Sequence, residues 1–409
     1  MPKPTPFHPR IQALCHSYQW KEWAGYHAVC NYDAHSEREY FAIRNAAGLL
    51  DVSPLYKYEF TGPDAAAVLS RIMTRDIATI GVGRVTYTCW CDEAGKALDD
   101  GTVARLGKEH FRVTASEPWL LWFRRLARGA DVTIRDSTRE LAALALQGPR
   151  ARAILDEVVD FDMNRMRFFR VRRMKLAGKG VWVSRTGYTG DLGYEIWMDP
   201  KDALPVWDAL MEAGKPHRME AMGLDALDVS RLEAGFILQG VDYFSARFAL
   251  IEGRKSSPFE IDLGGTVDLD RGPFMGQAAL KAEEAAGSPW ALVALSLDWE
   301  EIERLYASYD LPPHLAPVAW RSAVPVYASD GRSQVGQATS GTWSPLLKQS
   351  IALATVRTRH AAVGTRLKME YTVEFARKTV TATVVEKPLF DPERKRSTPG
   401  AQKTAEVAG

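Results

Sequence analysis

Residues 184–197, SRTGYTGDLGYEIW, place one carboxylate inside an otherwise apolar strand pattern. Glu195 lies there between Tyr194 and Ile196, after three glycines spaced three residues apart. A carboxylate buried in a strand is costly unless hydrogen-bond donors meet it. The segment therefore predicts a donor partner for Glu195 that its own strand does not supply. The alternative is a side chain that simply faces solvent.

The pair Asp99–Asp100, at the end of YTCWCDEAGKALDD, is the second candidate for chemistry. Alternation through Leu98, Asp100 and Thr102 puts the two carboxylates on opposite faces of a strand, so only one of them can point inward. A carboxylate held at a reacting centre can take or relay a proton. The alternative is an aspartate at a strand end with no chemical role.

The composition of the chain limits the classes of protein and partner to which these acidic residues can belong. The chain has 409 residues, 46% hydrophobic and 25% charged, with a net charge of +1 and a pI near 7.7. These values are ordinary for a globular protein of two or three domains and indicate neither a nucleic-acid nor a membrane partner. The N-terminus lacks the apolar segment of a signal peptide, and no apolar run is long enough to span a bilayer. We therefore expect a cytoplasmic protein.

The sequence predicts no metal site and no disulfide scaffold. The four cysteines are too few for such a scaffold, and Cys89 and Cys91 should face opposite sides of a strand. His27 and His35 lack a third ligand at helical or strand spacing. The cations of residues 165–175 alternate with Phe and Val, which is typical of a solvated strand face rather than a nucleic-acid patch.

Periodicity predicts the elements that must carry these residues. Residues 35–53 read as a helix that Gly48 stops, residues 56–74 as a strand, a turn and a helix, and residues 84–106 as two strands joined by the turn Asp92–Lys96. From about Trp290 the pattern changes to short alternating strands, which predicts a separate all-β domain. We expect domain boundaries that give regions 1–285 and 286–388, followed by a disordered polar tail, 389–409.

Six motifs in order resemble the glycine-cleavage T-protein (aminomethyltransferase) superfamily and its folate-dependent demethylase branch. Any one of them is weak, but together they run through nearly the whole globular chain. The motifs are WAGYHAVCNY (23–32), IRNAAGLLDVSPL (43–55), YTCWCDEAGKALDD (87–100), SRTGYTGDLGYEI (184–196), SRLEAGFILQGVDY (230–243) and the C-terminal run GQATSGTWSPLLKQSIALATV (336–356).

The resemblance implies an α+β, three-domain, ring-like fold with tetrahydrofolate in a central funnel and a C-terminal all-β barrel. The region 1–285 would hold two interleaved α+β subdomains that bind folate. In relatives, the glutamate that matches Glu195 accepts hydrogen bonds from the pterin amino and ring N–H groups. Two carboxylate oxygens can meet two adjacent donors as a bidentate pair.

The same resemblance implies roles for further residues. Its motif spacing from Tyr87 selects Asp100 as the carboxylate that takes or relays a proton near folate N5 and N10. Tyr188 would contact the pterin, Leu55 and Tyr87 would line the aminobenzoyl region, and Arg231 would contact folate. Tyr188, Leu55 and Tyr87 are also common core residue types. Arg231 has the alternative of a structural ion pair with Glu233 or another acid.

Departures from the family pattern bear on the substrate. Pro54 and Leu55 replace the family's His-Met, and Trp90, Tyr243 and Trp343 are large aromatics where glycine-cleavage enzymes carry smaller residues. Such aromatics suit a free, flat or cationic small molecule. Tyr243 resembles the position that protonates or orients the leaving heteroatom, with a core tyrosine as the alternative. The predicted substrate contacts are Tyr26, Tyr32, Trp90 and Trp343.

We therefore expect an enzyme that moves a methyl group from O, N or S of a small molecule to tetrahydrofolate, with a lipoyl carrier protein as an unlikely partner. One alternative is a glycine-cleavage aminomethyltransferase that acts on such a carrier. Another is a non-catalytic folate-binding protein, but the cysteine signature of that type is absent. The sequence does not name the methyl donor or the oligomeric state.

Overall fold

The computed structural model describes residues 1–315 and 318–399. The chain divides into two compact units, and each is described by itself. The N-terminal unit contains Met1–Thr88, Asp99–Ser230 and residues 391–399; the barrel unit contains Cys89–Leu98 and Arg231–Phe390. No helix in the described ranges is long and apolar enough to cross a lipid bilayer.

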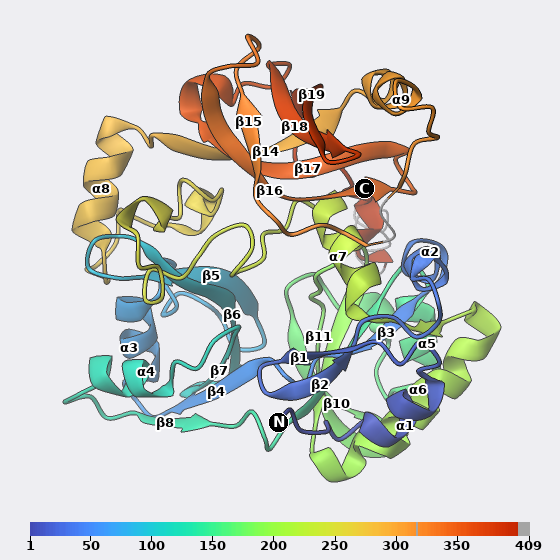
Figure 1. The fold of residues 1–409 in the computed structure, drawn as a ribbon. Helices are drawn as coiled ribbons and strands as arrows, with labels where there is room; N and C mark the ends of the chain where they lie inside the picture. Colours follow the sequence, from blue (N-terminus) through green and yellow to red (C-terminus); the bar gives the residue numbers. More distant parts are fainter. Residues whose placement is uncertain (316–317, 400–409) are drawn as a thin grey trace, which may run out of the picture. The chain divides into compact units, whose positions relative to one another are not determined.

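A six-stranded sheet forms the centre of the N-terminal unit, in the order β10-β11-β12-β9-β3-β13. Its neighbours pair antiparallel except β13, which runs parallel to β3. Helices α5 (Ala151–Val158) and α6 (Ala203–Gly214) pack against each other and bury their apolar sides with one face of this sheet (Figure 1). The strands are β3 (Gly48–Asp51), β9 (Ala142–Gln147), β10 (Val171–Leu176), β11 (Lys179–Ser184), β12 (Gly193–Met198) and β13 (Glu220–Ala221).

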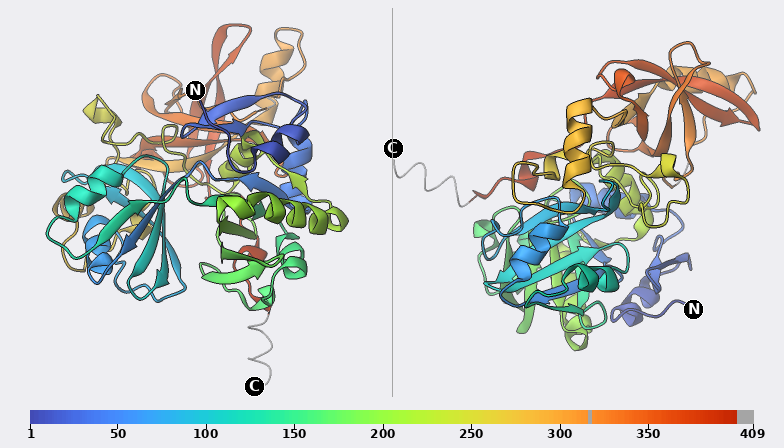
Figure 2. Two further views of the ribbon diagram at one scale, coloured as in Figure 1. Left: turned by 90° about the horizontal axis from the view of Figure 1, so that it is seen from below. Right: turned by 90° about the vertical axis from the view of Figure 1, so that its left-hand side faces the viewer.

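A five-stranded sheet has the order β5-β6-β7-β4-β8. Helices α3 (Ala65–Ile72) and α4 (Leu120–Leu126) contact each other, and Figure 2 shows them together beside this sheet. The Phe123 ring of α4 lies 5.2 Å from that of Tyr58 and 5.3 Å from that of Phe60, which anchors α4 on β4. The strands are β4 (Tyr56–Thr61), β5 (Val85–Cys91), β6 (Ala97–Gly107), β7 (His110–Ala115) and β8 (Thr133–Asp136).

The barrel unit contains a closed six-stranded barrel, β14-β17-β16-β15-β18-β19, filled by small and branched side chains. This confirms the expected mixed α+β fold with a C-terminal β-barrel. The predicted boundaries at 285 and 388 stay predictions. The barrel strands are β14 (Trp290–Leu297), β15 (Val324–Tyr327), β16 (Gln334–Ser344), β17 (Gln349–Arg357), β18 (Arg366–Val373) and β19 (Ala376–Val385), and the unit also has α8 (Gln277–Ala286) and α9 (Trp299–Ala307).

Shorter elements complete the fold. An N-terminal hairpin pairs Trp20 with Val29. Helix α7 contains both Ser230, where a segment of the N-terminal unit ends, and Arg231, where a segment of the barrel unit begins. These elements are α1 (His8–Leu14), β1 (Trp20–Trp23), β2 (Tyr26–Val29), α2 (Glu37–Asn45) and α7 (Leu224–Glu233), with 3-10 turns at Met163–Arg165, Pro200–Asp202, Lys215–His217, Glu252–Arg254, Gly264–Thr266, Thr358–His360 and Glu393–Lys395.

Two sequence predictions need correction. The helix predicted to stop at Gly48 already ends at Asn45, and Gly48–Asp51, for which no strand was predicted, is the buried strand β3, because its backbone pairs with β9 on one side and β13 on the other. The tail predicted as disordered is ordered at its start: residues 391–399 are described and include the 3-10 turn Glu393–Lys395. Residues 400–409 lie outside the described part of the chain.

Candidate active site

The buried member of the aspartate pair is Asp99, whose side chain is completely enclosed. Its Oδ1 accepts from the Asp100 N–H at 2.8 Å and the Ser116 hydroxyl at 2.6 Å. Its Oδ2 accepts from the Ser116 and Glu117 N–H groups, both at 3.1 Å, and from the Trp119 indole at 2.8 Å. Burial and the neighbouring Asp100 charge raise the pKa of Asp99, and these donors oppose the rise. Asp99 therefore fixes the turn after β7 to β6.

Asp100 points the other way and is only partly buried. Its Oδ2 accepts a hydrogen bond from the Tyr87 hydroxyl at 2.6 Å, and Tyr87 is partly buried on β5. The alternation expected along β6 thus separates a fully enclosed aspartate from a partly buried one. It joins two of the residues that the resemblance singled out.

Glu195 lies on β12 opposite Ser184 of β11 and Ala145 of β9. The Thr186 hydroxyl donates to Glu195 Oε2, and the Ser184 and Thr186 hydroxyls lie 2.6 Å apart. Burial raises the pKa of Glu195, while the Thr186 hydrogen bond and then the charge of Lys57 lower it. Within residues 1–315 and 318–399, no Lys or Arg nitrogen lies at ion-pair distance from this carboxylate.

The glycines of this segment have a packing reason. An added Cβ on Gly187 or Gly193 would overlap the side chain of Gln147. The Gln147 amide is buried between them and donates to the Thr186 and Tyr194 carbonyls at 3.3 and 3.4 Å. The loop therefore closes around a side chain of β9, and this arrangement sets where Thr186 meets Glu195.

Leu55 and the strand neighbours of Glu195 share one hydrophobic cluster. Glu195 pairs with Ala145, and Ala145 pairs with Leu50 of β3. Ala145 and Leu50 belong to the buried cluster against which the partly buried Leu55 packs. Paired residues lie on the same face of a sheet, so Glu195 projects on the side of the sheet where Leu55 lies.

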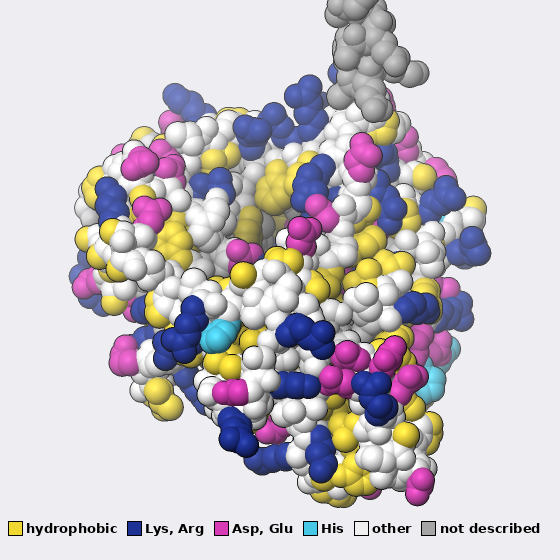
Figure 3. All heavy atoms as spheres, turned by 90° about the horizontal axis from the view of Figure 1, so that it is seen from above, with side chains coloured by type: hydrophobic (Ala, Val, Ile, Leu, Met, Phe, Trp, Pro, Cys, Tyr) yellow, Lys and Arg dark blue, Asp and Glu magenta, His cyan; other side chains and the backbone are white. Residues whose placement is uncertain are grey.

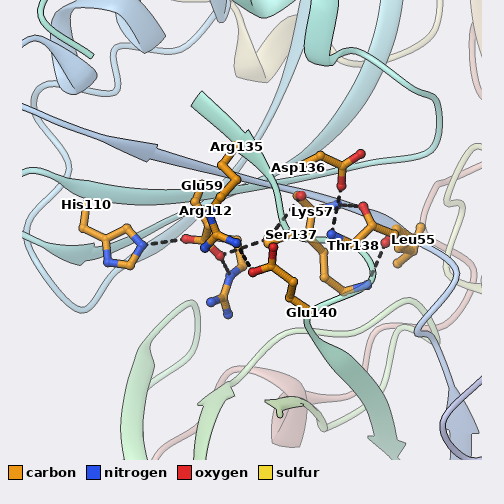
Figure 4. Close-up of polar contacts among 10 residues, drawn as sticks. All are labelled: Leu55, Lys57, Glu59, His110, Arg112, Arg135, Asp136, Ser137, Thr138 and Glu140. Carbon is orange, nitrogen blue, oxygen red and sulfur yellow. Dashed lines mark hydrogen bonds and ion pairs between the residues drawn. The ribbon is translucent and has the colours of Figure 1, made fainter. Parts of the chain in front are cut away.

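Sequence reasoning missed Lys57, a completely buried lysine on β4. Its Nζ donates to the Ser53 and Leu55 carbonyls at 2.8 and 2.7 Å, and Figure 4 shows the side chain reaching toward Leu55. Burial lowers the pKa of Lys57 to about 7, while the Asp51 charge opposes this. In the pattern YKYEFT the lysine would be assigned to a solvent face, but both faces of this strand are covered.

A second buried charge group lies next to Lys57 on the same sheet (Figure 4). Glu59 accepts from Arg112 at 2.7 Å and contacts the His110 ring at 2.6 Å. Burial alone would raise the pKa of Glu59, but the His110 and Arg112 contacts outweigh it and lower the pKa. The Arg112 guanidinium also lies 5.4 Å from the Trp197 ring of β12. Arg112 therefore has its own carboxylate partner, unlike Lys57.

In the barrel unit, Arg231 forms the ion pair that was the alternative to folate contact. It is completely buried and pairs with Asp242, and a contact between Arg231 and folate stays a prediction. Asp242 also accepts from the Thr339 hydroxyl at 2.6 Å, the Ser340 hydroxyl and the Leu238 N–H. The segments SRLEAG, GVD and ATSG thus meet around one carboxylate.

The aromatic candidates differ in burial. Tyr243 is 2% exposed, and its carbonyl accepts from the Gly240 N–H at 2.8 Å in the turn that Asp242 holds. Trp90 is completely buried, and Tyr32 lies in the core cluster with α5 and α6. The remaining candidates are partly buried: Tyr26 in β2, Tyr188 in the loop before β12, and Trp343 in β16, whose ring lies 5.0 Å from that of Trp299.

On the face drawn in Figure 3, Lys and Arg side chains lie among Asp and Glu side chains rather than in one patch. Among the described residues, no three His, Cys, Asp or Glu side chains are grouped so that they could hold a metal ion.

Two protein-family descriptions match this chain, one over its N-terminal part and one over its C-terminal part. The GCVT N-terminal domain family matches residues 12–271, and the glycine cleavage T-protein C-terminal barrel domain family matches residues 311–391. The chain belongs to the glycine cleavage T-protein family. It is therefore placed among folate-dependent enzymes.

Members of the T-protein family with different names are similar to this chain. The trimethylamine-oxide aldolase of Ruegeria pomeroyi is 36% identical over 410 residues, covering 97% of this chain and 48% of the aldolase. The chain thus spans about half the length of that relative. An aminomethyltransferase of Bacillus cytotoxicus is 34% identical over 360 residues, covering 87% of this chain and 89% of that protein.

The fold agrees with a solved structure of the family. The crystal structure of the glycine cleavage system aminomethyltransferase T from Bartonella henselae has a TM-score of 0.80 to this chain. It covers 96% of this chain and 99% of the other, at 23% sequence identity. This likeness concerns the fold.

Proposed function

We propose that this chain is a tetrahydrofolate-dependent demethylase that moves a methyl group from O, N or S of a free small molecule to tetrahydrofolate. The observation that carries the proposal is the Tyr87–Asp100 hydrogen bond of 2.6 Å on partly buried side chains. Asp99 beside it is occupied by five donors and is not available for proton transfer. Asp100 is thus the carboxylate of the pair that can act on a ligand.

The residues on β11 and β12 fit a pterin. A pterin presents an amino group and a ring N–H side by side, and a carboxylate accepts both as a charge-assisted pair. Glu195 is partly buried and receives hydroxyl donors, without an ion-pair partner within the described ranges. Two further N–H donors would offset the cost of its burial. Leu55, on the same side of the sheet, supplies apolar surface for the rest of a folate.

Asp100 would handle the proton. Tetrahydrofolate supplies the nitrogen that accepts the carbon, and this nitrogen must lose a proton when it is alkylated. Asp100 is the base for that proton, and the Tyr87 hydroxyl holds the carboxylate in one orientation. We therefore expect Asp100 to act during turnover more than in ground-state binding.

The donor side is assigned to Tyr243. The ion pair between Asp242 and Arg231 anchors the turn that contains Tyr243. The Tyr243 carbonyl accepts from the Gly240 N–H in this turn, and this bond fixes the main chain at the tyrosine. A hydroxyl at this position could protonate or orient a leaving heteroatom. Similarity to a protein named trimethylamine-oxide aldolase supports a small methylated donor rather than a protein-bound one.

A second candidate is the glycine-cleavage aminomethyltransferase reaction. Its support is the match to the Bacillus cytotoxicus aminomethyltransferase over 89% of that protein. This reaction would need an aminomethylated lipoyl carrier protein and would release ammonia.

One assay separates the two candidates. The purified protein is incubated with tetrahydrofolate and, separately, methoxy-aromatics, methylamines, methylsulfonium compounds or aminomethylated lipoyl carrier protein. Mass spectrometry then follows the folate product. We expect 5-methyltetrahydrofolate from one class of free donor. Methylenetetrahydrofolate and ammonia from the carrier protein alone would replace the demethylase proposal by the aminomethyltransferase.

The variant Tyr243→Phe identifies the leaving group. An alkoxide or phenoxide leaves far better when a proton reaches it, so this variant should nearly abolish O-demethylation. A sulfonium or quaternary ammonium donor releases a neutral group, and the same variant should slow that reaction only modestly. The check is kcat on the donor found active, beside wild type.

A further inference from the structure

Lys57 is held in an environment that a lysine rarely occupies. It is completely buried, and its Nζ contacts the main-chain carbonyls of Ser53 and Leu55. Its main chain is fixed as well: the Lys57 N–H donates to the Thr138 hydroxyl at 3.0 Å, and its carbonyl accepts from the Ser137 N–H at 2.8 Å (Figure 4). Fully buried lysines are scarce unless they are paired.

The charges around Lys57 are mostly acidic. Asp51, Asp136 and Glu195 act on it from β3, β8 and β12, and Arg112 is the like charge. Arg112 is neutralised by Glu59, and Asp51, which accepts from the Ser53 N–H at 2.9 Å, is the acid that acts on Lys57 most strongly. Glu195, in contrast, has hydroxyl partners only. The Lys57 ammonium contacts the Leu55 carbonyl, Leu55 packs on the cluster that contains Ala145, and Ala145 is the strand partner of Glu195. In keeping with this arrangement, the Lys57 charge lowers the pKa of Glu195.

The strand register explains how residues of two sheets come together. Glu195, Ala145 and Leu50 are paired across three adjacent strands, and Asp51 follows Leu50 at the end of β3. The chain then turns through Ser53 and Leu55 into β4, where Lys57 folds back onto the carbonyls of this turn. The ammonium is therefore located where the six-stranded sheet connects to the five-stranded one.

We propose that Lys57 is a positioning residue for the folate site, whose buried ammonium supplies the counter-charge of the Glu195 carboxylate and holds the Ser53–Leu55 turn beside it. The role of Lys57 in folate binding rests on the proposed function, because it requires that Glu195 binds the pterin. Lys57 acts through Glu195 and Leu55 and does not itself touch the ligand. Its charge keeps the acceptor ionised in a desolvated setting, where bidentate pairing to N–H donors requires the carboxylate form.

Two substitutions separate charge from hydrogen bonding. Lys57→Met removes both, whereas Lys57→Gln keeps an amide donor for a carbonyl of the turn and removes only the charge. Lys368→Met is the matched control, because Lys368 is a partly buried lysine of the barrel unit that pairs with Glu301. Circular dichroism and thermal unfolding establish that each variant is folded.

The first readout is the titration of Glu195 itself in the protein without folate. Carbon-13 NMR of protein labelled at the glutamate carboxyl carbons follows it, with Glu195→Gln identifying the resonance. Losing a nearby cation should raise the midpoint in both Lys57 variants by about one pH unit. Lys368→Met should leave it unchanged. An unchanged Glu195 midpoint in a folded Lys57 variant overturns the proposal.

A wild-type measurement needs no substitution at position 57. Because the pKa of Lys57 is lowered to about 7, its ammonium loses its proton within the range of the experiment. The Glu195 carbon should then show a second, smaller inflection near that pH. A single inflection across this range would contradict the proposed charge coupling.

The second readout uses 5-formyltetrahydrofolate as a stable probe of binding. At pH 6, Lys57→Met and Lys57→Gln should weaken its binding by roughly fivefold or more, whereas the same changes in a Glu195→Gln background should alter it less than about twofold. An equal loss in both backgrounds overturns an action through Glu195. A Glu195 titration that shifts while Glu195→Gln binds the probe like wild type would refute the proposed pterin contact and leave the charge coupling intact.

Discussion

At the scale of single residues, Asp99 and Asp100 show how one strand places two carboxylates in different surroundings. Both are aspartates on β6, yet Asp99 is enclosed by donors while Asp100 meets the Tyr87 hydroxyl. Opposite sides of a strand face different surroundings. The donors around Asp99 come from the turn after β7 and stabilise the fold, whereas Asp100 is only partly buried.

We expect Asp100→Asn to reduce kcat by at least about a hundredfold, since a general base contributes to the transition state. Affinity for 5-formyltetrahydrofolate and the unfolding free energy should change little. Steady-state kinetics, probe titration and urea unfolding measure the three quantities. A variant that loses binding but keeps kcat at saturating folate would make Asp100 a binding residue only.

Asp99→Asn should have the opposite profile. The amide group would direct N–H donors at the Ser116, Glu117 or Trp119 donors, so we expect a loss of roughly 2–4 kcal/mol in unfolding free energy. Urea unfolding beside Asp100→Asn makes the comparison. Equal stability of the two variants would contradict the structural role.

Glu195→Gln tests the pterin contact. The amide keeps the shape but replaces one acceptor by a donor, so affinity for 5-formyltetrahydrofolate should fall by roughly 1–3 kcal/mol. Isothermal titration calorimetry at neutral pH measures it. Unchanged affinity removes Glu195 from the site.

At the scale of elements, the C-terminal segment Asp391–Thr398, the strap, holds the loop that precedes β12. Arg185 is completely buried and donates to the Arg394, Lys395 and Ser397 carbonyls. In return, Arg394 forms two 2.7 Å bonds with the enclosed carboxylate of Asp191. The strap therefore fixes both ends of the loop that carries Thr186 and Tyr188.

Arg394→Gln should lower the unfolding free energy by roughly 1–3 kcal/mol, because it leaves the Asp191 carboxylate without its guanidinium partner. The control is Arg396→Gln, whose partner Asp391 is partly exposed and whose loss should cost less than about 1 kcal/mol. Urea unfolding gives both values. Similar small losses would show that the strap contributes little.

The buried carboxyl of Glu39, which accepts a hydrogen bond just before α7, should make the stability of the protein depend on pH. Glu39 accepts from the Tyr32 and Gly223 N–H groups, both at 2.6 Å, and burial raises its pKa to about 7 from the ordinary 4.5. Because the folded protein binds this proton more tightly than the unfolded chain, the contribution is complete below pH 4.5 and is lost as pH rises through 7. From pH 5 to 8 the wild type should lose roughly 2–3 kcal/mol more than Glu39→Gln, measured by urea unfolding. Parallel pH profiles of the two proteins would disprove this assignment.

At the scale of the whole molecule, the chain joins an N-terminal α+β unit to a β-barrel unit in the order that defines the T-protein family. Its match to the Bacillus aminomethyltransferase extends over most of that protein, while the aldolase is about twice as long. Within this frame we expect turnover to saturate with a free methyl donor and to be unaffected by added lipoyl carrier protein. Initial rates with and without the carrier test this, and a strict requirement for the carrier would contradict it.

The sequence by itself determined the family, the barrel and the residue types of the site, because motifs and periodicity are local properties of the chain. It also placed Asp99 and Asp100 on opposite faces, since strand alternation needs no tertiary information. Only the tertiary structure decided that Lys57 is buried, that Arg231 pairs with Asp242, and that β3 is a strand. Each of these depends on residues distant in sequence: those that bury both faces of β4, the turn at Asp242, and β9 and β13 beside β3. A pattern such as YKYEFT reports alternation, but the burial of each face depends on what packs against it.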